Sequence, residues 1–326
     1  MKRLAILVIV AAIAWSGYWF WSASVQKAAI EGWFDNRRSG GWVADFSDLT
    51  VKGFPNRLDT TLTAPRLGDP DVGVIWETPF LQLFRLSYNA KHLIAVLANE
   101  QTIKTSTREI GVTTSDLRAS LEIEDLNTVT PERFILVAED FKLETTDDRT
   151  LGIDVAQISA EATAHPNTYR LALDARGLKG ALPGWIESDT NNAIDRITVD
   201  LEVQLSGPIN LAHTTQLQPE SITIHLAEAQ WNGLSIAAAG DVEIGTAGTP
   251  VGRVTLKLRN WRELIAAERQ TGRLSQRALN QIDITLSLIS GLSGNPETLD
   301  LPFDFVNGKI WLGPLMIGDA PRLQLP

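Results

Sequence analysis

The stretch ITVDLEVQL, residues 197–205, shows the pattern that decides the fold of this chain. Its apolar and polar residues alternate, and successive side chains of a strand point to opposite faces of a sheet. The stretch is therefore predicted to be a strand with one apolar and one wet face, which is typical of an antiparallel sheet. The apolar positions are Ile197, Val199, Leu201, Val203 and Leu205.

The same period of two recurs along most of the chain beyond Trp42. Asn232-Gly233 and Asn307-Gly308 each join two such runs, and Asn-Gly accepts positive φ at both central positions of a tight hairpin. No helix-period segment separates successive runs, so parallel βαβ order is not expected. We predict a mainly β fold, either an extended antiparallel β-sheet or a two-lobed β-sandwich. The further strand candidates are 43–52, 58–63, 72–77, 80–86, 92–98, 117–123, 133–145, 153–163 and 169–175.

Two C-terminal segments favour short helices. Residues 261–270 follow Asn260, and Glu263 stands three positions after Asn260, as in a capping box. Residues 275–290 fit both a strand period and a helix period. Ser275 as the N-cap and Gly291 as a helix terminator favour the helix for this segment.

The stretch LAILVIVAAIAWSGYWFW, residues 4–21, carries no charge. As a helix its 18 residues rise about 27 Å, close to the roughly 30 Å hydrocarbon core of a bilayer. Lys2 and Arg3 precede it and acid-rich chain follows, which favours an N-terminus in the cytoplasm and the remainder outside. A cleaved signal peptide is the alternative. We favour a retained anchor, because the outer end is aromatic and a signal peptide has a shorter apolar centre.

The composition limits both the architecture and the partners. Acidic residues outnumber Lys and Arg by 39 to 29, which argues against nucleic acid, because its binding requires neutralised phosphates. The sequence contains no cysteine, which excludes disulfides and thiolate chemistry. Roughly 300 residues beyond the anchor predict two lobes or one long sheet. The expected parts are a transmembrane anchor at 1–23, a juxtamembrane helix at 24–41, a β lobe at 42–176, a connecting loop at 177–192 and a second β lobe with helices at 193–326.

Several strings together resemble one known family. The chain resembles the membrane-anchored bacterial family called domain of unknown function 2125. Four strings carry this resemblance: WFDNRRSGGW at 33–42, GFPNRLDTTL at 53–62, WETPFLQLFRLSYNAKHLIAV at 76–96 and GLSGNPETLDLPF at 291–303. That resemblance implies an inner-membrane anchor with a periplasmic domain and no established activity. The run at 237–261 more distantly resembles AsmA-like envelope proteins.

Two groups of residues are singled out as candidate sites. Strands such as 197–205 and 254–258 would place one set of apolar side chains in register on one face, where a phospholipid chain could lie: Val199, Leu201, Val203, Val254, Leu256 and Leu258. The second group is the distinctive string Gly53, Phe54, Pro55, Asn56, Arg57 and Asp59. A tight turn accounts for it, with Pro55 restricting φ, Asn56 tolerating the left-handed region, and Arg57 paired with Asp59 on one strand face.

The sequence contains no recognisable catalytic or metal-binding constellation. The four histidines lack metal-ligand spacing, and no nucleophile elbow or phosphate-binding loop occurs. Glu77 could be a carboxylate of raised pKa, but a strand-end charge is the simpler interpretation. We therefore expect no enzyme and no cofactor.

The leading hypothesis is an envelope protein that binds phospholipid on its apolar sheet face. The rival is a closed β scaffold that docks an envelope protein without binding lipid.

Overall fold

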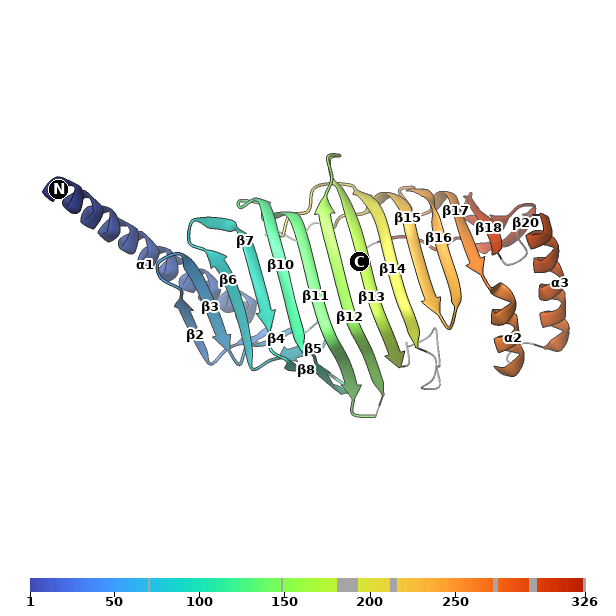
Figure 1. The fold of residues 1–326 in the computed structure, drawn as a ribbon, viewed down its shortest axis with the longest axis horizontal. Helices are drawn as coiled ribbons and strands as arrows, with labels where there is room; N and C mark the ends of the chain where they lie inside the picture. The colour runs from blue at the N-terminus through green and yellow to red at the C-terminus, as the bar shows by residue number, and fades with distance from the viewer. Residues whose placement is uncertain are drawn as a thin grey trace. The chain divides into compact units, whose positions relative to one another are not determined.

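The computed structural model describes residues 1–69, 71–147, 149–180, 193–211, 216–271, 275–292 and 298–324. It contains one long N-terminal helix, a single antiparallel sheet and two short C-terminal helices (Figure 1). The predicted fold class is thereby confirmed. Two compact units divide the chain, Met1–Ile153 and Asp154–Pro326, and we call them the first and second unit.

Helix α1, Lys2–Ser39, is continuous through the apolar stretch and the segment that follows it. The predicted juxtamembrane helix at 24–41 is therefore a continuation of the apolar helix, and it ends at Ser39. Arg37 and Arg38 lie in its last turn, where positive charge suits the C-terminal end of the helix dipole. Gly40 is the C-cap of the helix, and Gly41 adopts φ +85°, a conformation that glycine accepts without strain.

The strands of the first unit form two antiparallel series that both end on β11. One series runs β2–β3–β6–β7–β10 and the other β1–β4–β5–β8–β9. β10 pairs with residues 130–139 of β11 and β9 with residues 142–145, on either side of Asp140, which has φ +48°. The strands are β1 Val43–Asp45, β2 Asp48–Lys52, β3 Arg57–Thr63, β4 Arg66–Asp69, β5 Val74–Glu77, β6 Phe80–Leu86, β7 Asn89–Leu97, β8 Glu100–Thr105, β9 Glu109–Thr113, β10 Asp116–Asp125 and β11 Thr130–Thr145.

The core of the first unit lies between the last turns of α1 and the two strand series. Phe34 of α1 is 4% exposed and clusters with Ala44, Leu49 and Leu62 from three strands. The predicted strand at 43–52 is in fact two strands with different partners, since β1 pairs with β4 and β2 with β3. The break at residues 46–47 lets both strands contribute to the same core.

The second unit is an antiparallel meander from β13 to β20, in which each strand pairs with the next along the chain (Figure 1). Its predicted Asn-Gly hairpins are confirmed, because Trp231 pairs with Leu234 and Val306 with Lys309 across turns of positive φ. β12 spans the boundary between the units. The strands are β12 Thr150–Ala162, β13 Thr168–Gly180, β14 Ile194–Leu205, β15 Pro219–Trp231, β16 Leu234–Ile244, β17 Pro250–Arg259, β18 Thr298–Val306, β19 Lys309–Leu312 and β20 Leu315–Asp319.

The two predicted C-terminal helices are present, with different ends. α2 covers Trp261–Thr271 and α3 covers Gln276–Leu292, so Gly291 lies inside α3 and does not end it. The Asn260 side-chain amide donates to the Gly233 carbonyl oxygen at 2.8 Å, and the Glu263 backbone N–H donates to the Asn260 carbonyl oxygen at 2.9 Å. Asn260 is thereby used to join the helix start to the preceding hairpin.

The boundary between the units differs from the expected loop at 177–192. Residues 177–180 belong to β13, and the rest of that expected loop, 181–192, lies outside the described residues. Gly177 adopts φ +64°, so the glycine that suggested a loop instead accommodates a local twist within a strand.

Candidate functional site

The apolar side chains of β13 to β18 form four rows across one sheet face, two of which are interrupted by a glycine, Gly240 or Gly252. The strand pairing places each predicted face residue opposite another member of its row. A bulge in β15 near His225 keeps the rows in phase between β14 and β16. The four rows are Tyr169, Val203, Ile222, Val242, Gly252, Phe305; Leu171, Leu201, Ile224, Gly240, Val254, Phe303; Leu173, Val199, Ala227, Ala238, Leu256, Leu301; and Ala175, Ile197, Ala229, Ile236, Leu258, Leu299.

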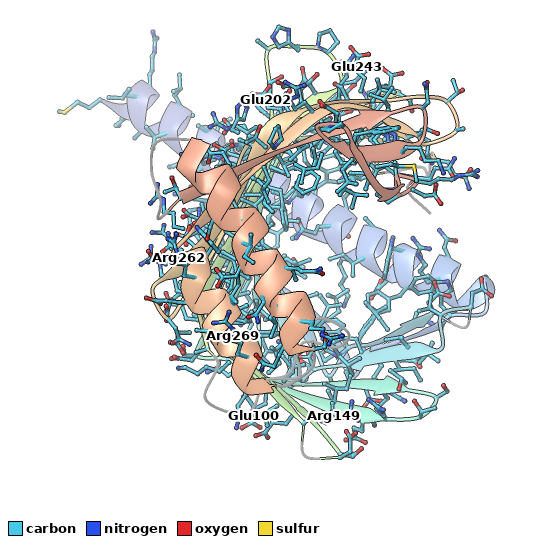
Figure 2. The ribbon with its side chains drawn as sticks, turned by 90° about the vertical axis from the view of Figure 1, so that its right-hand side faces the viewer. Glu100, Arg149, Glu202, Glu243, Arg262 and Arg269 are labelled. Carbon is cyan, nitrogen blue, oxygen red and sulfur yellow. The ribbon has the colours of Figure 1, made fainter. Side chains whose placement is uncertain are left out.

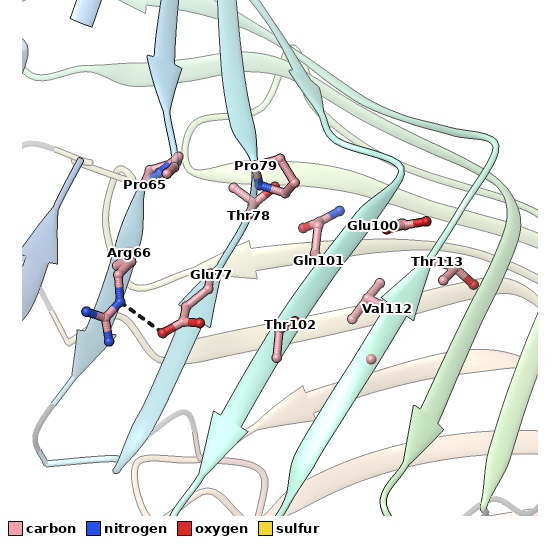
Figure 3. Close-up of a pocket in the computed structure, with 12 residues that line it drawn as sticks. Pro65, Arg66, Glu77, Thr78, Pro79, Glu100, Gln101, Thr102, Val112 and Thr113 are labelled. Atoms are coloured by element: carbon pink, nitrogen blue, oxygen red, sulfur yellow. Dashed lines mark hydrogen bonds and ion pairs between the residues drawn. The ribbon is translucent and has the colours of Figure 1, made fainter. Parts of the chain in front are cut away.

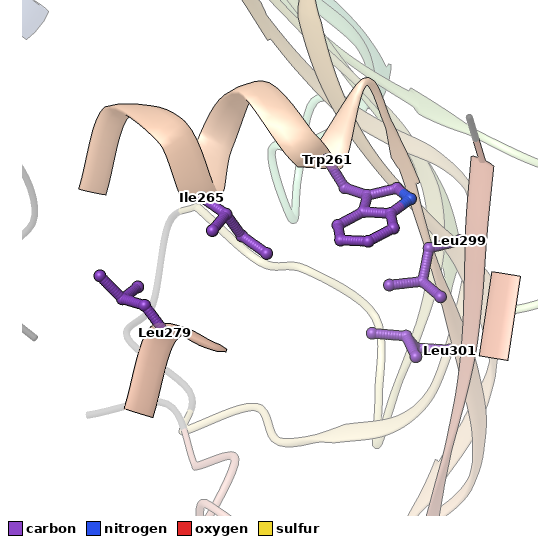
Figure 4. Close-up of a cluster of buried hydrophobic side chains, with 5 residues drawn as sticks. All are labelled: Trp261, Ile265, Leu279, Leu299 and Leu301. Carbon is purple, nitrogen blue, oxygen red and sulfur yellow. The ribbon is translucent and has the colours of Figure 1, made fainter. Parts of the chain in front are cut away.

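The helices α2 and α3 cover one end of this apolar face. Trp261 and Leu279 are each 1% exposed and pack with Ile265 against Leu299 and Leu301 of β18 (Figure 4). The partly buried residues against this cluster are Leu256, Leu258, Leu286, Phe303 and Leu312. Two of the predicted face residues, Leu256 and Leu258, therefore have a cover within the chain.

The other end of the apolar face, on β13 to β15, is mostly half-buried, although Tyr169 and Ala175 of β13 are buried. Val199, Leu201 and Val203 are half-buried, and in the described part of the chain they belong to neither hydrophobic core cluster. Burying an apolar side chain of this size fully contributes about 1.5–3 kcal/mol, so this end of the face can stabilise a bound apolar group. The pairing thus brings the predicted residues together, while the helices cover only part of them.

The opposite face of the same strands is polar and ion-paired. Arg170 makes a two-point contact with Asp200, with Nε to Oδ1 at 2.8 Å and Nη2 to Oδ2 at 2.6 Å. This contact lowers the pKa of Asp200 and raises that of Arg170. In Figure 2 the side chains of Glu202 and Glu243, from the same strands, project outward from the ribbon. The two faces therefore differ sharply in chemistry.

In the string from Gly53 to Asp59, residues 53–56 form the turn between β2 and β3, and Arg57 and Asp59 lie in β3. The Arg57 backbone N–H donates to the Gly53 carbonyl oxygen at 2.9 Å, and Arg57 Nε donates to Asp59 Oδ1 at 3.0 Å. The predicted turn and ion pair are confirmed. The residue of positive φ is Gly53, at +105°, and not Asn56 as predicted. A Cβ at Gly53 would lie 2.9 Å from the Arg57 Cβ and carbonyl oxygen, which explains the glycine there.

This turn docks onto the aromatic end of the apolar helix, which the sequence analysis did not anticipate. Trp15 Nε1 donates to the Pro55 carbonyl oxygen at 3.0 Å, and Trp19 Nε1 donates to that of Arg57 at 2.8 Å. The Phe54 ring meets the Trp19 ring edge-on at 5.5 Å. The neighbouring β6–β7 turn is bound in the same way, because Tyr18 Oη donates to the Ser87 carbonyl oxygen at 2.9 Å. We call these two turns, residues 53–56 and 87–88, the docked turns.

A buried polar bridge follows one to two turns further along the helix. Gln26 Nε2 donates to Thr60 Oγ1, and Gln26 Oε1 accepts from Arg85 Nε. Thr60 is fully buried and Gln26 is 9% exposed. Burial lowers the pKa of Arg85. A single glutamine of the helix thus hydrogen-bonds two polar side chains of the sheet. The sequence gives no sign of this role, because Thr60 and Arg85 are far from Gln26 along the chain.

Glu77 lies in a pocket of about 490 Å³ in the first unit, between the β3–β4 connection, β8 and β9 (Figure 3). Its carboxylate accepts from Lys104 Nζ at 2.7 Å and from Arg66 Nε at 2.9 Å. The hydrogen bond from Lys104 is the largest cause that lowers its pKa. Glu77 is therefore held ionised, which opposes the raised-pKa interpretation and favours a structural charge. Among the described residues, no cluster of His, Asp and Glu could hold a metal ion.

Comparison with known proteins identifies the chain's family. The model of DUF2125, an uncharacterized protein conserved in bacteria, matches residues 19–321. The chain belongs to the DUF2125 family. The match includes both docked turns and the whole apolar face. Comparisons with curated proteins and with solved structures return no match, and the likeness to AsmA-like proteins is not shown.

By length and composition, α1 of this DUF2125 chain could cross a membrane, so it is compatible with a single-pass anchor.

Proposed function

We propose that this DUF2125 chain is an inner-membrane protein of the bacterial envelope, anchored by α1, with both β units on the periplasmic side. The apolar stretch 4–21 is uncharged and preceded by Lys2 and Arg3, which supports a cytoplasmic N-terminus. Apart from Ser16 and Trp19, the residues of this stretch are exposed, as expected for a segment that contacts lipid tails.

We further propose that the half-buried end of the apolar face binds a phospholipid acyl chain. The observation that carries this proposal is the set of apolar rows on β13 to β15 that runs beyond the helices α2 and α3. An acyl chain is long, apolar and about as wide as a strand spacing, so it fits along a row of Val and Leu side chains. The ion-paired opposite face leaves only one side of the sheet for such a ligand.

The proposal assigns a binding role and no reaction. The candidate acid Glu77 is ion-paired to two cations and has a lowered pKa, which supports a structural carboxylate over a proton donor. His225 Nε2 lies 3.5 Å from Glu202 Oε1 on the ion-paired face, and His92 Nε2 is hydrogen-bonded to Ser120 Oγ at 2.9 Å. Each of these two histidines therefore contacts a side chain of a neighbouring strand. These contacts favour a non-enzymatic protein.

Native mass spectrometry of the full chain extracted in detergent tests the lipid-binding proposal. We expect phospholipid to remain bound to the unaltered chain and to Gln204→Asp, an exposed position on the ion-paired face. Leu201→Asp should lose the lipid while the protein stays folded, because an unpaired carboxylate in an apolar site is costly.

Two results would contradict this proposal. Purified full chain that carries no phospholipid and takes up none from vesicles would overturn it. Unfolding of the whole second unit by Leu201→Asp, without any lipid bound to the unaltered chain, would instead favour the closed β scaffold that docks a protein partner.

A further inference from the structure

The two docked turns of the first unit are fixed to α1 at a known height along the helix. Residues 53–56 contact Trp15, Trp19 and Phe20, whose ring stacks on Phe54 at 6.0 Å, and Ser87 accepts from Tyr18. All of these helix positions lie within the apolar stretch 4–21. The height of the turns in a bilayer is therefore set by which part of that stretch spans the hydrocarbon core.

The part of the helix before the docked turns is too short to span a bilayer. Residues 4–14 rise only about 16 Å, about half of the roughly 30 Å hydrocarbon core. Extending the span to Trp21 supplies about 27 Å, and any tilt of the helix shortens its projection further. Hence a spanning α1 places Trp15 to Phe20, and the turns bound to them, within the outer boundary of the bilayer.

The docked turns have the composition of a membrane-inserted surface. Phe54 is 52% exposed, Tyr88 is 65% exposed and the adjacent Leu86 is 37% exposed. Residues 53–56 and 86–88 carry no charge. Aromatic side chains with a polar edge are enriched at this depth, where the ring is apolar and the edge remains hydrated.

The polar groups of the turns are satisfied in a way that suits this depth. A backbone carbonyl without a partner is costly in a bilayer, where water is scarce. The carbonyl oxygens of Pro55, Arg57 and Ser87 each accept from an aromatic side chain of α1. The Asn56 carbonyl oxygen accepts from the Ser87 backbone N–H at 2.9 Å. The side-chain donors of α1 and the backbone carbonyl oxygens of the turns thus satisfy each other's hydrogen bonding at the same height along the helix.

From these observations we propose that the docked turns insert into the outer interface of the lipid bilayer, with Phe54 and Tyr88 as the inserted side chains. This proposal rests on the proposed membrane span of α1. The first unit then sits directly on the membrane, held by a rigid helix and two turns rather than by a flexible tether.

Single labels in reconstituted vesicles test the insertion, because the chain has no native cysteine. Phe54→Cys and Tyr88→Cys of the full chain are each labelled with a polarity-sensitive fluorophore and reconstituted in phosphatidylcholine vesicles. The vesicles contain lipids with a spin-label quencher either near the glycerol backbone or near the acyl-chain end. Val72→Cys, an apolar position that is 69% exposed on another turn of the same unit, is the matched control, and Ile9→Cys reports on the span.

We expect the labels at 54 and 88 to be quenched at least about twofold more strongly by the shallow quencher than the label at 72. Ile9→Cys should be quenched most by the deep quencher. Labels at 54 and 88 that behave like the label at 72, while Ile9→Cys is quenched, would overturn the insertion and leave the anchor intact. An unquenched Ile9→Cys label would refute the anchor and the insertion together. Tyr88 lies outside the ring stack on α1, so its variant reports on the turn even if Phe54→Cys disturbs that stack.

Discussion

The indole Nε1 of Trp19 donates a 2.8 Å hydrogen bond to the backbone carbonyl oxygen of Arg57, and this contact joins the apolar helix to the sheet of the first unit. Trp19 is 5% exposed although it belongs to a stretch that is otherwise mostly exposed. The contact shows that α1 is part of the folded first unit as well as a candidate membrane span.

Replacement of Trp19 should destabilise the first unit. Trp19→Phe leaves the Arg57 carbonyl without its donor, at a cost of about 1–3 kcal/mol. Trp19→Ala also empties the site beside Phe54, with an expected cost of about 3–5 kcal/mol. Thermal unfolding of the full chain in detergent, followed by circular dichroism, measures both changes. Trp21→Ala is the control, since Trp21 is 64% exposed, and equal midpoints for Trp19→Ala and Trp21→Ala would contradict the assigned role.

The bridge from Gln26 to Thr60 and Arg85 should show coupled energetics. Gln26→Leu leaves the half-buried Arg85 guanidinium without its acceptor, and we expect a loss of about 2–3 kcal/mol. Adding Arg85→Met should restore more than about 1 kcal/mol of that loss, because the uncompensated charge is removed. Urea unfolding of the two single variants and the double variant measures the coupling. Strictly additive losses would show that the two side chains do not depend on each other.

Two glycines of the second unit should differ in their tolerance of a side chain. A Cβ at Gly240 would lie 2.1 Å from the Arg253 carbonyl oxygen, so Gly240→Ala should force β16 and β17 apart. Gly233 has φ +76° but open space around a Cβ, so Gly233→Ala should cost only about 1–2 kcal/mol of backbone strain. Chemical unfolding of both variants compares them. An equal cost at the two positions would contradict the close approach of the strands.

The Arg170–Asp200 pair should stabilise the second unit at neutral pH and lose its effect in acid. The hydrogen bond from Arg170 lowers the pKa of Asp200 below its ordinary value of 3.8, so the unfolded chain takes up the proton first as the pH falls. The contribution is therefore present above pH 3.8 and disappears as the pH falls below that value toward the lowered pKa of the folded state. For an exposed pair it amounts to about 0.2–1 kcal/mol.

Urea unfolding of the wild type and of Asp200→Asn at pH values above and below 3.8 measures this dependence. We expect the stability difference between the two proteins at neutral pH to shrink in acid. A difference that stays constant across this range would show that the carboxylate contributes nothing through its charge.

The sequence alone predicted the elements whose pattern is local. The uncharged run at 4–21 predicts a long helix, the alternation at 197–205 predicts a strand, and Asn-Gly pairs predict hairpins. Each depends only on residues within a few positions of one another, because side-chain period and turn φ values are local properties. The shared apolar face of Val199, Leu201 and Val203 follows from the same alternation.

Tertiary structure alone decided which of these surfaces meet. The break between β1 and β2, the helices that cover Leu256 and Leu258, and the docking of Phe54 on Trp19 all join residues far apart in the chain. An amphipathic strand does not specify what covers its apolar face, since Leu presents the same surface to a helix, a sheet or a lipid chain. The string at 53–59 has a local turn as its explanation, but its position against the apolar helix depends on the closure of the whole first unit.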